Sequence, residues 1–404
     1  MMKSLNDFVL CCGVSHKDTL SSIWMDGCPT AQLAARTAAG SCYSSRCRIA
    51  GRDFCHELMV DAKLPVKTED MWKTLFWHWF DKPLSFSKQA AYSDRARDVL
   101  RACQTTVHSH WREIDWSTVN GVDPEQKQFF FMAHEMSTQY THAPQRFASI
   151  AEPWQNMCRD LTANMFFLSH ESNNADLKNP VRDAARETFE CMDGSHALFL
   201  GLSTDMMTEI WKLCMHVQKT RLDPAIVPRL TRCHLVVLDI AIAQCGLLTP
   251  HARGSYTHMV LQQMRQRPLF YCNGQCKILG NELDRPSQDL NWVKAAVSAA
   301  QRAVKAYSEM VHETIGQSYA EQHLECFDLF TWYTLDRNDP DTFSKNYPGL
   351  LTVDQLEQHY QKCCLTMGFT AQLQSFRRVT RVCVCLCVCE GVKHVSVCCF
   401  SLLC

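Results

Sequence analysis

Apolar residues recur at helical spacing through most of the chain. After Thr68-Glu69-Asp70, large apolar side chains stand three or four positions apart until Lys82-Pro83, as on the buried face of an amphipathic helix. Asn179-Pro180 places a proline in the first turn of a second such stretch, and Asp193-Gly194 has the composition of a helix end. The pattern therefore predicts one helix that ends at Lys82 and another over 179–193.

The middle of the chain repeats these signals with short gaps. Three further helices are predicted there, from about Asp205 to Lys219, from Asp223-Pro224 to Gly246, and from Thr249-Pro250 to about Arg267-Pro268. Ser203 is expected to be the N-cap of the first of them. Helices joined by short connections are typical of stacked antiparallel pairs, as in irregular α-solenoids. No motif recurs at a fixed period, so no repeat family is indicated.

One segment breaks the helical pattern. Asn273-Gly274 stands between two apolar-rich runs, and both residues adopt the positive φ angles of a tight two-residue turn at low cost. We therefore expect a small β-hairpin near 269–278, inserted between helices.

The longest helix is predicted to begin at Ser287-Gln288-Asp289. Its apolar seam consists of Val293, Val297, Ala300, Val304, Tyr307 and Val311. This spacing suits packing against a single partner helix, either within the chain or in a dimer. Two other helix starts are predicted at Asp123-Pro124 and at a capping box formed by Thr352 and Gln355.

The predicted fold class is all-α, with irregular stacked helix pairs in an α-solenoid-like arrangement or a helical bundle, and one small β-hairpin near 269–278. Five regions are expected along the chain: a Cys-rich amino-terminal region (1–66), a helical region (67–175), stacked helix pairs (176–268), a hairpin with a long and a terminal helix (269–375), and a low-complexity Val/Cys tail (379–404).

The amino-acid composition favours some classes of fold and function over others. Among 404 residues there are only 15 Gly and 14 Pro, which favours long helices over many short strands. Lys+Arg is 41 and Asp+Glu is 42, and this balance gives no support to a general nucleic-acid surface. The longest apolar run, His234 to Leu248, is interrupted by polar residues and falls short of the roughly 20 needed to span a membrane. We expect a chain without a transmembrane segment that stays in the cytoplasm or nucleus, with its 24 cysteines reduced.

The carboxyl-terminal stretch has an unusual pattern. Residues 382–389 alternate between an aliphatic residue and cysteine, and a GT dinucleotide repeat translates as alternating Val and Cys. We interpret the tail as translated repeat DNA, with a metal-binding or palmitoylated tail as the alternative. Because the first 50 residues also lack a clear helix start, the chain is hypothesised to be a fragment of a larger helical protein.

Cysteine and histidine residues are the candidate metal ligands. Cys272 and Cys276 have a pair spacing that zinc sites use, and His258 or His251 would complete a site if the fold brought them together. A second candidate group lies at the amino terminus: Cys11, Cys12, His16, Cys28, Cys42, Cys47, Cys55 and His56. Buried thiols are the simpler interpretation, so no cofactor is expected and zinc is kept as the alternative.

Catalytic motifs are incomplete. His56-Glu57, His134-Glu135, His170-Glu171 and His312-Glu313 are His-Glu pairs, yet none extends to H-E-x-x-H. Glu309 and His312 form an E-x-x-H unit without the second unit that a di-iron site needs. The segment 201–205 begins like a nucleophile elbow but lacks its second glycine.

Three functional hypotheses remain. The leading one is an intracellular helical scaffold whose partners are other proteins. The alternative is an enzyme or metal-binding protein whose site is assembled from distant residues, such as His56, His134, His170 and His312. The third is a helical nucleic-acid-binding protein, which a formal net charge of −1 disfavours.

Overall fold

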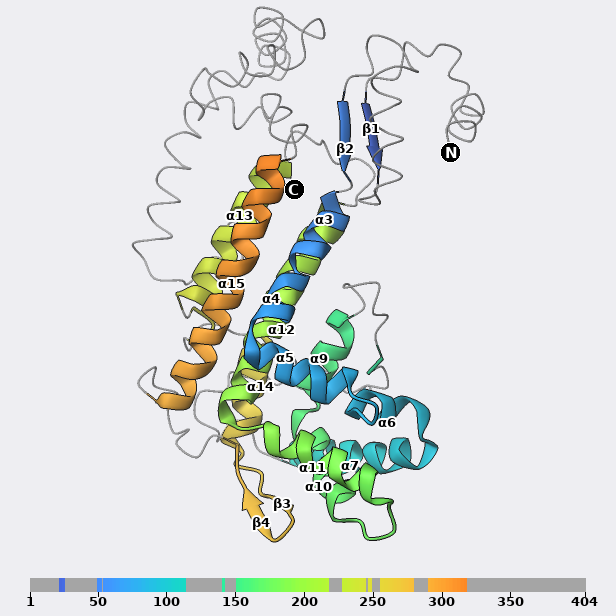
Figure 1. Ribbon diagram of the computed structural model, residues 1–404. Coiled ribbons are helices and arrows are strands. Elements are labelled where there is room, and N and C mark those ends of the chain that lie inside the picture. The colour runs from blue at the N-terminus through green and yellow to red at the C-terminus, as the bar shows by residue number, and fades with distance from the viewer. Residues whose placement is uncertain are drawn as a thin grey trace, which may run out of the picture. The chain divides into compact units, whose positions relative to one another are not determined.

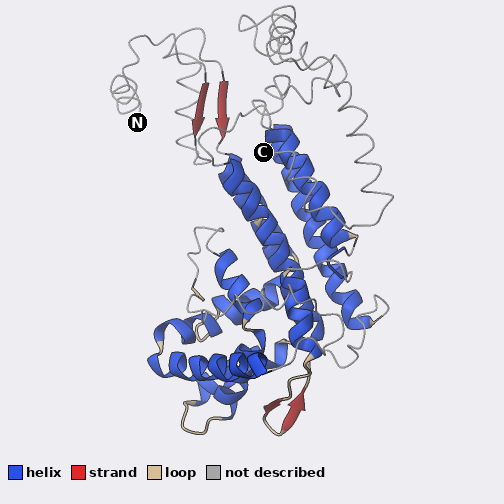
Figure 2. Cartoon of the chain, turned by 180° about the vertical axis from the view of Figure 1, so that it is seen from behind, coloured by secondary structure: helices blue, strands red, loops and turns tan. Residues whose placement is uncertain are grey.

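The computed structural model describes residues 22–25, 49–52, 54–113, 140–141, 150–217, 227–244, 246–248, 255–279 and 290–317. The chain forms two compact units. The smaller contains Met1–Leu58, Met215–Cys233 and Val311–Cys404, and the larger contains Met59–Cys214 and His234–Met310. Most of the described chain is helical (Figure 2), which confirms the predicted all-α class.

The helices of the described residues have the following bounds: α3 (Phe54–Asp61), α4 (Lys63–Thr68), α5 (Asp70–Phe76), α6 (Phe86–Tyr92), α7 (Asp94–Glu113), α9 (Ala151–Arg159), α10 (Leu161–Asn173), α11 (Asn179–Cys191), α12 (Gly194–Val217), α13 (Val227–Leu238), α14 (Tyr256–Arg265) and α15 (Asn291–Gln317). Two π-helical turns, Trp77–Asp81 and Asp239–Ala243, extend α5 and α13, and a 3₁₀ turn spans Gly246–Leu248. None of these described helices is both long and apolar enough to cross a bilayer.

The smaller unit contains two short strands that the sequence pattern did not predict. Strand β1 (Ser22–Met25) pairs in parallel with β2 (Ile49–Arg52). Four residues are too few for a strand periodicity to stand out from a loop or a helix, which explains why the pair was missed.

Helix α10 lies at the centre of the larger unit. It packs against α7, α9, α11, α14 and the hairpin strand β3 (Figure 1). Most of its residues are buried, including polar ones such as Asn164 and Glu171. A helix that is covered on all sides must find partners for its polar side chains inside the protein, and this requirement organises the polar contacts described below.

The helix predicted to end at Lys82 is confirmed. It consists of α5 and the π-helical turn, which closes with a hydrogen bond of 3.0 Å from the Lys82 N–H to the Trp77 carbonyl. The ring centroid of the buried Trp154 lies 6.2 Å from that of Trp72 and 5.5 Å from that of Phe80. The aromatic stripe is therefore core packing.

Helix α12 begins eleven residues before the predicted start at Asp205. The Asp193 carboxylate accepts a hydrogen bond of 2.9 Å from the His196 N–H, so Asp193-Gly194 opens α12 in addition to ending α11. Ser203 is consequently inside the helix, and its prediction as an N-cap was wrong. Its hydroxyl donates to the Leu200 carbonyl at 3.1 Å and accepts from Trp154 Nε1 at 2.9 Å.

The predicted hairpin is confirmed. Strands β3 (Phe270–Cys272) and β4 (Gln275–Lys277) are antiparallel. Asn273 has φ 48° and Gly274 has φ 80°, so both central residues adopt the positive φ of a type I′ turn. Ahead of the hairpin, α14 starts at an N-cap serine, Ser255, whose side chain accepts a hydrogen bond from the His258 N–H. This helix therefore begins after the predicted start at Thr249-Pro250, and those two residues lie outside the described residues.

Helix α15 confirms the predicted long helix, and its part in the larger unit packs within the chain. Gln301 Nε2 donates to the Ala243 carbonyl at 2.7 Å. Arg302 forms a bidentate ion pair with the buried Glu69 at 2.9 and 2.8 Å. The buried face of α15 differs from the predicted apolar seam at one position. Val297 is half-buried, while its neighbour Ala296 is fully buried.

His234 of α13 leads to the first testable expectation. Burial lowers the pKa of its imidazole to about 4. The unfolded chain takes up this proton near the usual value of about 6.5, so the contribution to stability is complete above that pH and is lost as the pH falls towards 4. Between pH 7.5 and 4.5 we expect His234→Asn to lose about 2–3 kcal/mol less stability than the parent, as measured by urea unfolding.

The control for this experiment is His110→Gln, because His110 is exposed on α7. Its pH dependence should match that of the parent. Equal pH dependence in the parent and in His234→Asn would show that His234 is not held in its neutral form.

Candidate functional site

The two cysteines of the zinc candidate point to opposite faces of the hairpin. Cys272 lies opposite Gln275, and Cys276 lies opposite Tyr271. Side chains alternate between the faces of a strand, so Cys276 shares a face with Tyr271 while Cys272 points the other way. Cys272 is buried with its Sγ atom 3.2 Å from Ser172 Oγ, whereas Cys276 is exposed.

The third candidate ligand, His258, is buried in α14, where its Nε2 atom lies 3.1 Å from Gln262 Nε2. Among the described residues, no group of three or more His, Cys, Asp or Glu side chains is arranged to hold a metal ion. Within that part of the chain, Cys272, Cys276 and His258 are therefore not brought together. His251 and the candidates before Cys55 lie outside the described side chains.

In one His-Glu pair, His170-Glu171, the buried glutamate forms an ion pair with a partly exposed arginine. Glu171 of α10 is fully buried and accepts hydrogen bonds from the guanidinium of Arg95 on α7, one of them 3.1 Å long. His170 Nδ1 lies 3.2 Å from the same carboxylate. The Glu171 carboxylate thus joins α10 to α7. His134 and the side chain of His56 lie outside the described residues, so the assembled histidine site stays a prediction.

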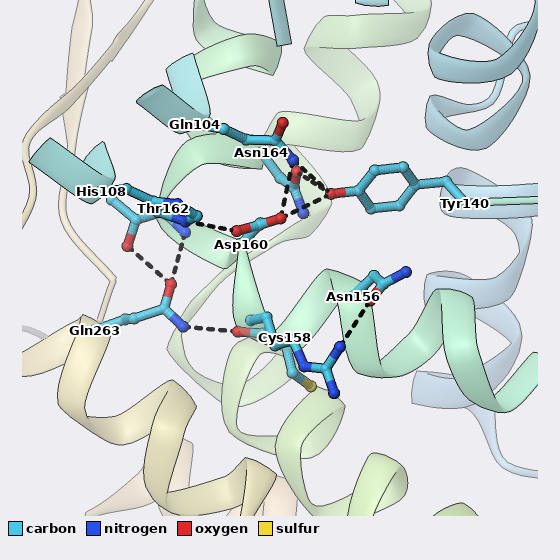
Figure 3. Close-up of polar contacts among 10 residues, drawn as sticks. Gln104, His108, Tyr140, Asn156, Cys158, Asp160, Thr162, Asn164 and Gln263 are labelled. Atoms are coloured by element: carbon cyan, nitrogen blue, oxygen red, sulfur yellow. Dashed lines mark hydrogen bonds and ion pairs between the residues drawn. The ribbon is translucent and has the colours of Figure 1, made fainter. Parts of the chain in front are cut away.

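The most concentrated polar cluster surrounds Asp160, the single residue between α9 and α10 (Figure 3). Its Oδ1 atom lies 3.0 Å from His108 Nε2. Its Oδ2 atom accepts hydrogen bonds from Gln104 Nε2 at 2.9 Å and from the Tyr140 hydroxyl at 3.2 Å. The cluster therefore joins α7, Tyr140 and the α9–α10 junction through one carboxylate.

Gln263 of α14 fixes the same junction from another side (Figure 3). Its side-chain oxygen accepts from the Thr162 N–H at 2.9 Å and from the Thr162 hydroxyl at 3.1 Å. Its side-chain nitrogen donates to the Cys158 carbonyl at 2.6 Å. Both ends of one amide are used, so Gln263 bridges the two sides of the break between α9 and α10.

His108, Asp160 and Tyr140 are of the residue types that acid–base enzymes use. Here they have a structural role. A general base must come within hydrogen-bonding distance of a substrate. His108, Asp160 and Tyr140 are 6%, 1% and 2% exposed, so each is enclosed by protein. Burial, reinforced by the Asp160 charge, raises the pKa of Tyr140 well above its usual value, so the phenol remains a donor. We assign the cluster to fixing the helix junction.

Sequence reasoning missed this cluster entirely. The bonded side chains are 20 to 56 positions apart along the chain. Nothing beside Asp160 marks the break, because Arg159-Asp160-Leu161 contains no glycine or proline. No local signal in the sequence identifies these partners.

The segment that resembled a nucleophile elbow is part of α12. Its last residue, Asp205, accepts hydrogen bonds from the Tyr256 N–H at 2.9 Å and the Thr257 N–H at 2.8 Å. Burial raises the pKa of Asp205 to about 6, although the bonds from Thr257 oppose the increase. Asp205 thus caps the first turn of α14 from a neighbouring helix and does not serve a serine nucleophile.

Lys82 is a buried amine, a type of group that enzymes use as a nucleophile. Its Nζ atom donates to the Ala184 carbonyl at 2.7 Å and lies 3.1 Å from His78 Nδ1 and 3.4 Å from Glu187 Oε2. Burial lowers the pKa of Lys82, with Glu187 acting in the opposite direction. These protein acceptors occupy the ammonium group, so we assign it to holding the π-helical turn against α11.

The remaining candidate is a surface on the β3–β4 hairpin. Leu269 and Tyr271 are 56% and 54% exposed, and the exposed Cys276 lies opposite Tyr271. The other face of the hairpin belongs to the core, where Phe270 packs against Phe166 with ring centroids 4.9 Å apart. We call Leu269, Tyr271 and Cys276 the outer hairpin face. An exposed sheet face is usually polar, so the exposed Leu269 and Tyr271 side chains make the outer hairpin face unusual.

Comparison of the chain with protein-family models, with curated proteins and with solved structures found no match.

Proposed function

We propose that this protein is a helical protein-interaction module and that the outer hairpin face is a docking element for a partner protein. The observation that supports the proposal is the exposure of Leu269 and Tyr271 on a hairpin whose opposite face is buried. Tyrosine is enriched in protein interfaces, and exposed apolar side chains on a hairpin suit a protein better than a small molecule, which needs a concave site.

The hairpin is held in place before any partner binds. Asn173 of α10 donates from Nδ2 to the Tyr271 carbonyl at 2.8 Å and accepts from the Asn273 N–H at 3.0 Å. Lys277 donates to the carbonyls of Phe189 and Glu190 at the end of α11, at 2.8 and 3.1 Å. A surface that is already ordered loses little conformational entropy on binding, which favours association.

The polar clusters of the larger unit support the same proposal. The side chains of Asp160, Asp205, Glu171 and Lys82 have the chemistry of catalytic groups, yet each is bonded to protein donors or acceptors, and all but the half-buried Asp205 are buried. Their contacts stabilise the positions of helices. The outer hairpin face differs from these clusters because its Leu269 and Tyr271 side chains are exposed to solvent.

The test compares two variants of the full chain as bait for affinity capture. The double variant Leu269→Ser, Tyr271→Ser should abolish capture of a stoichiometric partner set that the parent retains. Both side chains are more than half exposed, so the free energy of unfolding should change by no more than about 0.5 kcal/mol for each substitution.

The control is Tyr92→Ser, because Tyr92 is 81% exposed at the end of α6. This variant should capture the same partners as the parent. Equal capture by the parent and the hairpin double variant would refute the proposal, as would a folded parent that retains no partner.

A further inference from the structure

The turn of the β3–β4 hairpin contains an asparagine side chain that the fold does not protect. Asn273 and Gly274 are both exposed, and a Cβ atom placed on Gly274 would meet no heavy atom within 4 Å apart from its chain neighbours. Among the described residues, none forms a hydrogen bond with the side-chain amide of Asn273. Solvent therefore surrounds this amide and the peptide bond that follows it.

The residue after Asn273 makes this amide reactive. The side-chain amide carbon of an asparagine can be attacked by the main-chain nitrogen of the next residue, which closes a five-membered imide ring. Glycine has no Cβ atom to hinder the attack, and its backbone rotates more freely than that of any other residue. Asn273 is the one asparagine of the described residues that a glycine follows.

The reaction needs only water as a co-reactant. The Gly274 nitrogen forms a bond to Asn273 Cγ, the Cγ–Nδ2 bond breaks, and the Gly274 amide proton leaves with the side-chain nitrogen as ammonia. Water then adds to one of the two imide carbonyls and breaks its bond to the Gly274 nitrogen. Hydrolysis at Cγ gives aspartate, whereas hydrolysis at the main-chain carbonyl leaves the chain running through Cγ, which is isoaspartate. Nothing is oxidised or reduced.

The contacts of the turn with α10 oppose the ring closure. The ring forms only after the Asn273–Gly274 peptide plane has rotated out of the type I′ turn, in which the two φ angles are 48° and 80°. Asn173 resists this rotation, because it accepts a hydrogen bond of 3.0 Å from the Asn273 N–H and donates one of 2.8 Å to the Tyr271 carbonyl. The fold therefore sets how often the reactive conformation occurs.

We propose that Asn273-Gly274 is a self-modification site, at which the hairpin turn converts to isoaspartate at a rate set by Asn173. Aspartate at this position keeps the turn, because Asp-Gly suits the same type I′ geometry. Isoaspartate adds one carbon atom to the main chain, so the two-residue turn is lost. The turn fixes the register of the strands, so the Cys272–Gln275 pair opens and Cys272 leaves its buried position beside Ser172.

The experiment keeps the full chain at about pH 8 and 37 °C under reducing conditions and follows each asparagine by peptide mapping with mass spectrometry. The internal control is Asn174, which precedes an alanine and accepts a hydrogen bond of 3.0 Å from the Asp176 N–H. Asn273 should convert at least about fivefold faster than Asn174, because alanine hinders the attack that glycine permits. Conversion of Asn273 no faster than that of Asn174 would overturn the proposal.

The part assigned to Asn173 has its own variant. Asn173→Ala removes both hydrogen bonds to the hairpin and should speed conversion at Asn273 at least about threefold, because the turn opens more often. An unchanged rate would show that Asn173 does not control the reaction.

The structural consequence is measured by labelling thiols with iodoacetamide. Asn273→Gly has no side-chain amide, and Gly-Gly also fits a type I′ turn. After the incubation, Cys272 should be labelled in the parent but not in Asn273→Gly. Freshly prepared Asn273→Asp carries the new charge on a normal main chain and should also remain unlabelled. Equal labelling of the incubated parent and Asn273→Gly would show that conversion does not open the hairpin.

These readouts require no partner protein, so the inference and the proposed function can fail separately. If Asn273 converts and the variant Leu269→Ser, Tyr271→Ser still captures the partner set, the inference stands and the proposed function is wrong. If Asn273 does not convert and that double variant loses the partner set, the proposed function stands and the inference is wrong.

Discussion

Replacing Asp160 by alanine is expected to lower the free energy of unfolding by about 3–5 kcal/mol. The substitution removes the acceptor shared by His108, Gln104 and Tyr140, so each of these buried side chains loses a hydrogen bond. Asp160→Asn keeps one acceptor oxygen and should cost less than the alanine variant. Urea unfolding followed by circular dichroism measures both.

The matched control is Asp183→Ala on α11. Asp183 is more than half exposed and pairs with Arg186 at 3.4 Å, so its removal should change stability by less than about 0.5 kcal/mol. If Asp160→Ala and Asp183→Ala lost equal amounts of stability, the Asp160 cluster would not hold the α9–α10 junction.

The second large effect is expected for Gly201→Ala in α12. Within a helix this change is ordinarily stabilising by about 0.5–1 kcal/mol. Here a Cβ atom would lie 2.7 Å from the Cα atom of Thr257, and backbone cannot rotate away as a side chain can. Helices α12 and α14 would have to separate, and we expect a net loss of about 2 kcal/mol.

Larger residues at this position should cost more, so Gly201→Val should unfold at a lower urea concentration than Gly201→Ala. Lys212→Ala serves as the control on the same helix, because the Lys212 side chain is 54% exposed. Its stability should change by less than about 0.5 kcal/mol. A Gly201→Ala protein as stable as the parent would show that the two helices separate without cost.

The sequence pattern predicted correctly those helices and turns that are determined by residues close together in the chain. The stripe before Lys82 and the Asn273-Gly274 turn correspond to observed elements because helical spacing and turn chemistry act over a few residues. The start of α12 was misplaced because Asp193-Gly194 is suited to both the end of one helix and the cap of the next. Only the structure shows that the pair has both roles here.

The polar clusters could not be predicted for a different reason. Asp160 meets His108 across 52 positions, and Lys82 meets Ala184 across 102. A periodicity shows that a residue faces the core but not what lies opposite it. The zinc interpretation of Cys272 and Cys276 had the same weakness, because spacing alone does not show on which face of a hairpin a side chain lies.

The ion pair between Glu69 and Arg302 has a consequence for synthesis of the chain. The two residues are 233 positions apart. At about 5–20 residues per second, a ribosome needs roughly 10–50 s to pass from the first residue to the second. During that interval Glu69 has been synthesised without Arg302, so the larger unit cannot form this ion pair until Arg302 has emerged.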